Sequence, residues 1–148
     1  MSSDHDISVL NGLTTTTLDS MKGYEDAARD AESTKFASMF ADFARDRAQV
    51  ASALQAEVTR LGGEPETSSS LLAAAHRTLV DLKQAFTSND DKEIITEVER
   101  GEDHIKTKFE RALEDRDLSP EADAVIQEAY GSVRQGHDQM SALKHSLT

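Results

Sequence analysis

The chain has 148 residues, no cysteine and a formal net charge of −12 at pH 7, which together exclude several classes of protein. Without cysteine there can be no disulfide, no thiolate catalysis and no cysteine-ligated zinc or iron–sulfur centre. The negative charge argues against nucleic acid and against an anionic membrane surface, because both attract basic proteins. No stretch approaches the roughly 20 apolar residues of a membrane-spanning helix, and the N-terminus lacks the basic and apolar regions of a signal peptide. We therefore expect a cytoplasmic globular protein.

The composition also favours helices over strands. Aromatic residues make up 5% of the chain and only two residues are proline, while alanine and charged helix formers are abundant. The apolar spacing predicts two long amphipathic helices over residues 6–31 and 34–61. Ser33 is the expected N-cap of the second helix, which implies a tight antiparallel turn. In the following "LGGEP", a glycine supplies the left-handed C-cap conformation and the proline prevents the helix from continuing.

The second half of the chain repeats the pattern after a polar link. We expect a short connector helix over residues 71–86 and two further long helices over 91–116 and 120–146, with Ser119 as the N-cap of the last. The prediction is therefore a single all-α domain, a four-helix bundle with an additional short helix between the second and third long helices. The link could carry the chain back along the bundle as a crossover, and a plain up-down bundle with an extra packed helix is the alternative.

One position of the third long helix interrupts its apolar face. In "ERGEDHIKTKFE" the apolar spacing arrives at Glu102, where a buried side chain is expected. Arg47 and His137 occupy similar positions near the middle of their helices, and Tyr24 lies at about the same height on the first helix. Because burying one charge alone is costly, these groups are expected to pair. The predicted polar layer, structural or ligand-binding, comprises Tyr24, Arg47, Glu102 and His137.

Three glycines lie inside the predicted helices, each next to a layer residue. They are Gly23, Gly101 and Gly136. A glycine inside a helix costs about 1 kcal/mol relative to alanine. Their repetition at one height predicts that space is needed there for close helix packing, ordered water or a ligand. Chance is the alternative.

The layer has two interpretations, a structural network and a metal or small-ligand site. Di-iron bundles use Glu-x-x-His pairs, in which both ligands lie on one face of a helix. The chain contains no such pair, and Arg47 would repel a cation, so a di-iron oxidase is disfavoured. A weaker iron or zinc site would use Glu102 and His137 with Glu99 or Glu25.

Four segments resemble those of a bacterial ferritin-like family known as a domain of unknown function: "LNGLTTTTLDSMKGYEDAA", "HRTLVDLKQAF", "ERGED" and "GHDQM". The resemblance runs from about Ile7 to His145, and it departs from the family at Ser20, where glycine is often found. It implies a ferritin-like four-helix bundle with the crossover connection, an incomplete ferritin-type ligand set and no established catalytic activity. The residues it carries over by position are Tyr24, His76, Arg77, Glu102, Asp103 and His137.

The functional prediction is a non-enzymatic bundle, with a stress-linked role suggested by the resemblance alone. Two alternatives are open: a metal-binding or redox bundle that holds iron or zinc, and a self-assembling or partner-binding module. No cofactor is expected in the first interpretation. Secondary site candidates are His76, Arg77 and Asp103; ordinary helix packing is the other interpretation of His76 and Arg77.

Overall fold

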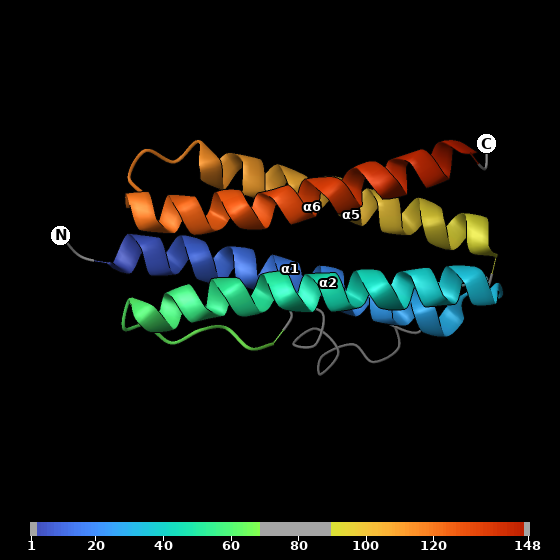
Figure 1. The fold of residues 1–148 in the computed structure, drawn as a ribbon, viewed down its shortest axis with the longest axis horizontal. Helices are drawn as coiled ribbons and strands as arrows, with labels where there is room; N and C mark the ends of the chain where they lie inside the picture. The colour runs from blue at the N-terminus through green and yellow to red at the C-terminus, as the bar shows by residue number, and fades with distance from the viewer. Residues whose placement is uncertain (1–2, 69–89, 147–148) are drawn as a thin grey trace, which may run out of the picture.

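The computed structural model describes residues 3–68 and 90–146 (Figure 1). They form four helices: α1 (Asp4–Asp30), α2 (Thr34–Arg60), α5 (Asp91–Leu113) and α6 (Pro120–Ser146). The predicted all-α four-helix bundle is confirmed, and no observed helix end differs from its predicted position by more than three residues. The connector helix predicted over residues 71–86 lies outside the described residues. None of the described helices is both long and apolar enough to cross a membrane.

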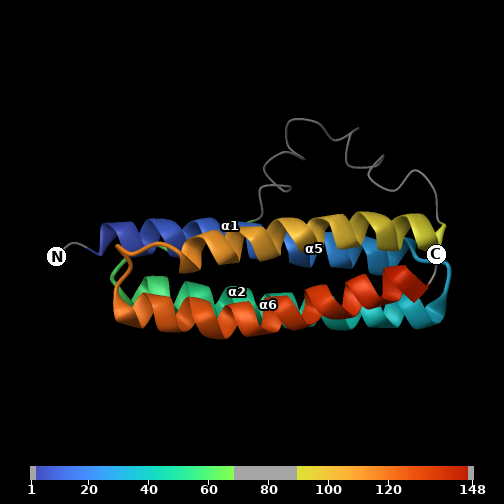
Figure 2. The ribbon, with the colours of Figure 1, turned by 90° about the horizontal axis from the view of Figure 1, so that it is seen from above.

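The four helices lie side by side along one axis (Figure 1), and each packs against two antiparallel neighbours (Figure 2). α2 ends near the start of α1, where Asn11 Nδ2 donates a hydrogen bond to the Glu64 carbonyl oxygen at 3.0 Å. α5 begins at the opposite end, where the Asp91 carboxylate accepts hydrogen bonds from the Glu32 and Ser33 N–H groups at 2.8 and 3.0 Å. The connection from α2 to α5 is therefore a crossover, which excludes the plain up-down alternative.

Capping residues mark the starts and ends of the helices at the positions that the sequence predicts. The Ser33 hydroxyl accepts a hydrogen bond from Phe36 N at 3.5 Å, and the Ser119 hydroxyl accepts one from Ala122 N at 3.1 Å. Gly62 follows α2 with φ 85°, the left-handed conformation that glycine adopts without a steric cost. Both predicted N-caps and the glycine C-cap are confirmed.

Two apolar clusters fill the core, one in each half of the bundle. The half that holds the starts of α1 and α6 contains, among others, Leu10, Leu54, Phe109 and Ile126. The other half contains Tyr24, Phe40, Ile94 and Met140, among others. Between the clusters lie polar residues that are at most 2% exposed: Thr14, Thr17, Arg47 and Glu102. The apolar core is therefore interrupted by polar side chains at mid-height.

The two threonines need no partner from another helix. Thr14 Oγ1 donates to the Leu10 carbonyl oxygen at 2.8 Å, and Thr17 Oγ1 donates to the Leu13 carbonyl oxygen at 2.7 Å. Such bonds to the preceding turn satisfy a buried hydroxyl within its own helix. Arg47 and Glu102 cannot be satisfied within their own helices in this way, so they pair across helices.

Candidate functional site

Side chains from three helices meet at mid-height, and we call Arg47, Glu102 and Tyr24 the buried group. Arg47 Nη2 of α2 lies 2.5 Å from Glu102 Oε1 of α5. The Tyr24 hydroxyl of α1 donates a hydrogen bond to the same carboxylate oxygen. The exposed fractions of Arg47, Glu102 and Tyr24 are 2%, 1% and 2%. One carboxylate oxygen thus connects three helices out of contact with solvent.

Aromatic rings cover one side of the buried group. The Tyr24 ring stacks on Phe43 with 5.0 Å between centroids and 14° between planes. The guanidinium carbon of Arg47 lies 5.8 Å from the centroid of the Tyr24 ring. A cation is attracted to the face of an aromatic ring, so Tyr24 holds the ion pair with both its hydroxyl and its ring.

The protonation state of Tyr24 follows from its surroundings. Burial raises the pKa of its hydroxyl well above the usual value of 10.0, the Glu102 charge raises it further, and the Arg47 charge opposes the rise. A hydroxyl with so high a pKa stays protonated at physiological pH. Tyr24 therefore acts as a neutral hydrogen-bond donor and not as a base.

Two atoms of the buried ion pair have no hydrogen-bond partner among the described residues. They are Arg47 Nη1, a donor, and Glu102 Oε2, an acceptor. Leaving a buried polar atom without a partner costs about 1–3 kcal/mol. The pair can therefore form further hydrogen bonds without giving up the contact between its charges.

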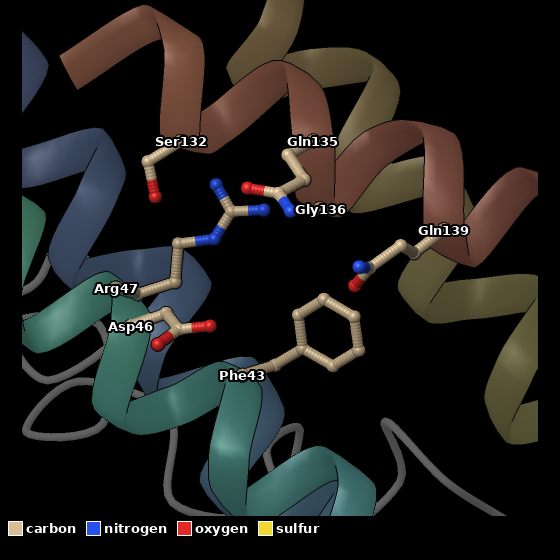
Figure 3. A pocket seen from close by; sticks show the side chains of 7 residues that line it. All are labelled: Phe43, Asp46, Arg47, Ser132, Gln135, Gly136 and Gln139. Carbon is tan, nitrogen blue, oxygen red and sulfur yellow. The ribbon is translucent and has the colours of Figure 1, made fainter. Parts of the chain in front are cut away.

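A pocket of about 70 Å³ lies between α2 and α6 at the height of Arg47 (Figure 3). Besides Phe43, it is lined by Asp46 and Arg47 of α2 and by Ser132, Gln135, Gly136 and Gln139 of α6. The Arg47 guanidinium points from α2 toward α6 (Figure 3).

Gly136 allows the Arg47 guanidinium to approach α6. A Cβ atom at this position would lie 2.6 Å from Arg47 Nη2 and 3.4 Å from Phe43 Cε1. A Cβ at Gly23 or Gly101 would meet no described atom within 4 Å. Close helix packing at a glycine is therefore confirmed for Gly136 and wrong for Gly23 and Gly101, where the space beside the backbone is open. Each precedes a layer residue by one position, and neighbouring residues of a helix point about 100° apart.

The structure does not bring His137 into the buried group. Its side chain is 15% exposed, and its Nε2 lies 2.7 Å from Asp103 Oδ1. Nδ1 lies 3.4 Å from Asp138 Oδ1. The inward position on this turn of α6 belongs to Gly136, which is buried. Two predicted site residues, His137 and Asp103, thus meet each other at the edge of the interface between α5 and α6.

The predicted metal ligands are not gathered around one point. Glu102 Oε1 is engaged by the arginine and tyrosine of the buried group. Glu99 Oε2 lies 3.3 Å from Lys144 Nζ, and Glu25 is exposed. With His137 turned toward Asp103, this ligand set does not form a site in the described part of the chain.

A different group of metal-ligating side chains lies at one end of the bundle. Ligand atoms of His5, Asp115 and Asp117 lie within 4.8 Å of one another, with His5 and Asp117 exposed. His5 Nε2 is 2.7 Å from Asp115 Oδ2. A hydrogen bond from the Asp117 N–H and the neighbouring His5 lower the pKa of the Asp115 carboxyl. Sequence reasoning missed this group because its members are far apart in the chain, and it fastens α1 to the turn before α6.

A family model described as a domain of unknown function (DUF2383) matches residues 5–115. The match confirms that the family is a domain of unknown function. It includes every residue of the buried group and ends before α6, so it is shorter than the resemblance predicted from about Ile7 to His145. His76 and Arg77 fall within the match and lie outside the described residues. A comparison with curated proteins finds no match.

Proposed function

Since the chain belongs to the family described as a domain of unknown function (DUF2383), which names no activity, we propose a function from its geometry. The chain is a non-enzymatic cytoplasmic bundle in which the buried group fixes the register of the helices. The observation that carries this proposal is the single Glu102 oxygen that side chains of two other helices engage out of solvent. Tyr24 and Glu102, which could exchange protons with a substrate, are at most 2% exposed.

The buried group is needed to fix the register because apolar contacts alone are similar in strength when one helix shifts along another. Sliding one helix by a turn of about 5.4 Å replaces one apolar contact with another. The same slip would leave Arg47 or Glu102 among apolar side chains without its partner, and an unpaired buried charge is strongly destabilising. A single polar position can specify register in helical assemblies in this way.

Because the buried group has a structural role in this proposal, any interaction with other molecules takes place at the surface. With a net charge of −12, the surface favours a basic or neutral partner, or a second copy in which opposite charges meet. Iron or zinc binding at the buried group is disfavoured, because a guanidinium 2.5 Å from Glu102 Oε1 already occupies the position of a cation.

Two variants test the proposal. Glu102→Gln should lower the free energy of unfolding by about 3–5 kcal/mol, because the Arg47 charge stays buried without its partner. The paired replacement Arg47→Met with Glu102→Leu, made together with Tyr24→Phe so that no buried hydroxyl loses its acceptor, should recover most of that loss, because the pair is exchanged for apolar packing. Urea unfolding followed by circular dichroism measures both, and Glu97→Gln, in an exposed ion pair with Arg100 at 2.9 Å, is the control.

Stability alone does not report on register, so the paired variant needs a second measurement. Slipped arrangements are no longer penalised in it, and its amide NMR spectrum should show more than one set of resonances from the core helices. A single set, with the parent pattern, would exclude the register role. Unchanged stability of Glu102→Gln would exclude the buried ion pair itself.

A further inference from the structure

We propose that His5, Asp115 and Asp117 bind a divalent transition-metal cation of the zinc class at one end of the bundle. This end holds the start of α1 and the turn between α5 and α6 (Figure 1). The inference concerns a metal site outside the buried group and does not rest on its register role. It is carried by the mixed ligand set, by the charges around it and by the contacts that hold the ligands in place.

Ligand atoms of the three side chains already lie close together. One atom from each lies within 4.8 Å of the other two, and His5 Nε2 is 2.7 Å from Asp115 Oδ2. In a tetrahedral zinc site, ligand atoms about 2.0–2.1 Å from the metal are about 3.3 Å from one another. Because His5 and Asp117 are exposed, small side-chain rotations can reach this spacing. No other three histidine or acidic side chains in residues 3–68 and 90–146 gather as closely.

No lysine or arginine among the described residues pairs with either aspartate of this group. The charged partner of Asp115 is His5. By contrast, Glu102 is matched by Arg47 at 2.5 Å, and Glu99 Oε2 lies 3.3 Å from a lysine Nζ. A divalent cation at the end of the bundle can therefore neutralise two carboxylates without displacing a basic side chain.

Hydrogen bonds to the backbone hold the ligands in position. The Asp117 N–H donates to Asp115 Oδ1 at 2.9 Å, while Asp115 Oδ2 faces His5. Asp6, the neighbour of His5, is 6% exposed, and its Oδ1 accepts a hydrogen bond from the Ser119 N–H at 3.1 Å. The first turn of α1 is thus fastened to the turn that carries both aspartates. Such hydrogen bonds around the ligands orient them for a metal.

The imidazole of His5 selects the class of cation. Oxygen ligands alone suit magnesium and calcium, whereas an imidazole nitrogen suits zinc, copper and nickel. Three protein ligands leave at least one coordination position for water. The metal would join α1 to a turn 110 residues away in the chain. We therefore expect zinc to bind this end and to stabilise the folded chain.

Isothermal titration calorimetry of the metal-free full chain, with Zn²⁺ and Mg²⁺ added separately, tests the proposal. Zn²⁺ should bind at one site, and Mg²⁺ should bind at least about ten-fold more weakly, because only zinc gains from the imidazole. Saturating Zn²⁺ should also raise the urea midpoint of unfolding, because the three ligands are brought together only in the folded chain.

Two variants locate the site, each with a matched control. His5→Ala and Asp117→Ala remove one ligand each from exposed positions. Each should weaken zinc binding at least about ten-fold, since the loss of a group that merely orients a ligand already costs about that much. His104→Ala and Asp46→Ala make the same changes at exposed positions outside the site and should bind zinc as the parent does.

Each other outcome overturns the proposal. Mg²⁺ binding as tight as Zn²⁺ binding would indicate unselective attraction to an acidic surface, and an absence of saturable zinc binding would remove the site. Unchanged zinc affinity in His5→Ala or Asp117→Ala would remove that side chain, and with it the three-ligand site. An unchanged urea midpoint would show that the unfolded chain binds zinc equally well. These variants leave the buried group intact, so the outcomes are independent of the test of the register role.

Discussion

The middle and the ends of the bundle both use carboxylates to hold helices together, but the partners differ. In the middle, Glu102 is engaged by two side chains from other helices and is 1% exposed. At one end, Asp91 accepts hydrogen bonds from two backbone N–H groups of the turn between α1 and α2. At the other end, Asp6 Oδ1 accepts a hydrogen bond from the Ser119 N–H at 3.1 Å.

The comparison shows that the surroundings of a carboxylate decide its energetic importance. Removing Asp91 frees backbone N–H groups at an exposed or half-buried turn, where water can replace the lost acceptor. Removing Glu102 leaves the charge of Arg47, which is 2% exposed, without the carboxylate that compensates its burial. We therefore expect the loss of one partner in the middle to cost several times more than a similar loss at an end.

The largest effect should come from Arg47→Met. The variant leaves the Glu102 carboxylate buried without its counter-charge, and the free energy of unfolding should fall by about 3–5 kcal/mol. The matched control is Arg100→Met. That arginine is 72% exposed in its pair with Glu97, and its loss should cost less than about 0.5 kcal/mol. Equal losses in urea unfolding would show that burial does not distinguish the two pairs.

Tyr24→Phe should have the next largest effect. It keeps the ring that stacks on Phe43 and removes only the hydrogen bond to Glu102. Because the acceptor is charged, the loss should be about 1.5–3 kcal/mol, read from the urea midpoint. If Tyr24→Phe lowers the free energy of unfolding as much as Arg47→Met does, the hydroxyl contributes as much as the ion pair, and the ion pair is not the main source of stability.

The same tyrosine makes stability depend on pH in the alkaline range. Its pKa is raised in the folded state, so the unfolded chain releases this proton above about pH 10 while the folded chain retains it. Stability should therefore be complete below about pH 10 and fall as the pH rises toward the folded pKa, and Tyr24→Phe should reduce this fall. The chain has two tyrosines, so in Tyr130→Phe the phenolate absorbance reports Tyr24 alone and should appear only with unfolding.

The smallest of these effects should come from Asp91→Ala at the end of the bundle. It removes the acceptor of the Glu32 and Ser33 N–H groups, and we expect a loss of about 1.5 kcal/mol, at the low end for bonds to a charged group. Glu93→Ala, an exposed change in the same turn of α5, should cost about 0.3 kcal/mol through the helix dipole. If Asp91→Ala destabilises the protein as much as Arg47→Met, the contrast between middle and ends fails.

Much of the fold could be predicted because its signals are local. Ser33, Ser119 and the glycine after α2 set helix ends through bonds that span a few residues. Arg47 and Glu102 could be placed inside the bundle because a charge on an apolar helix face requires a partner.

The side chains that failed to follow prediction depend on how a helix is rotated. Gly136 and His137 are neighbours near the apolar face of α6, and periodicity does not distinguish which of them points inward. From the sequence, Asp91 is an acidic residue in the first turn of a helix, where its charge is favourable to the helix dipole. Its hydrogen bonds to the turn between α1 and α2 join positions too far apart in the chain for any local pattern to connect.

The sequence by itself determined where the four described helices begin and end and that opposite charges lie within the bundle. Capping and amphipathic spacing act over one or two turns of chain, so they can be seen without a structure. Only the tertiary structure decided that one Glu102 oxygen serves both Arg47 and Tyr24, that Gly136 faces the core in place of His137, and that α2 and α5 run in the same direction. These features depend on the rotation and offset of one helix relative to another, which packing of the whole bundle decides.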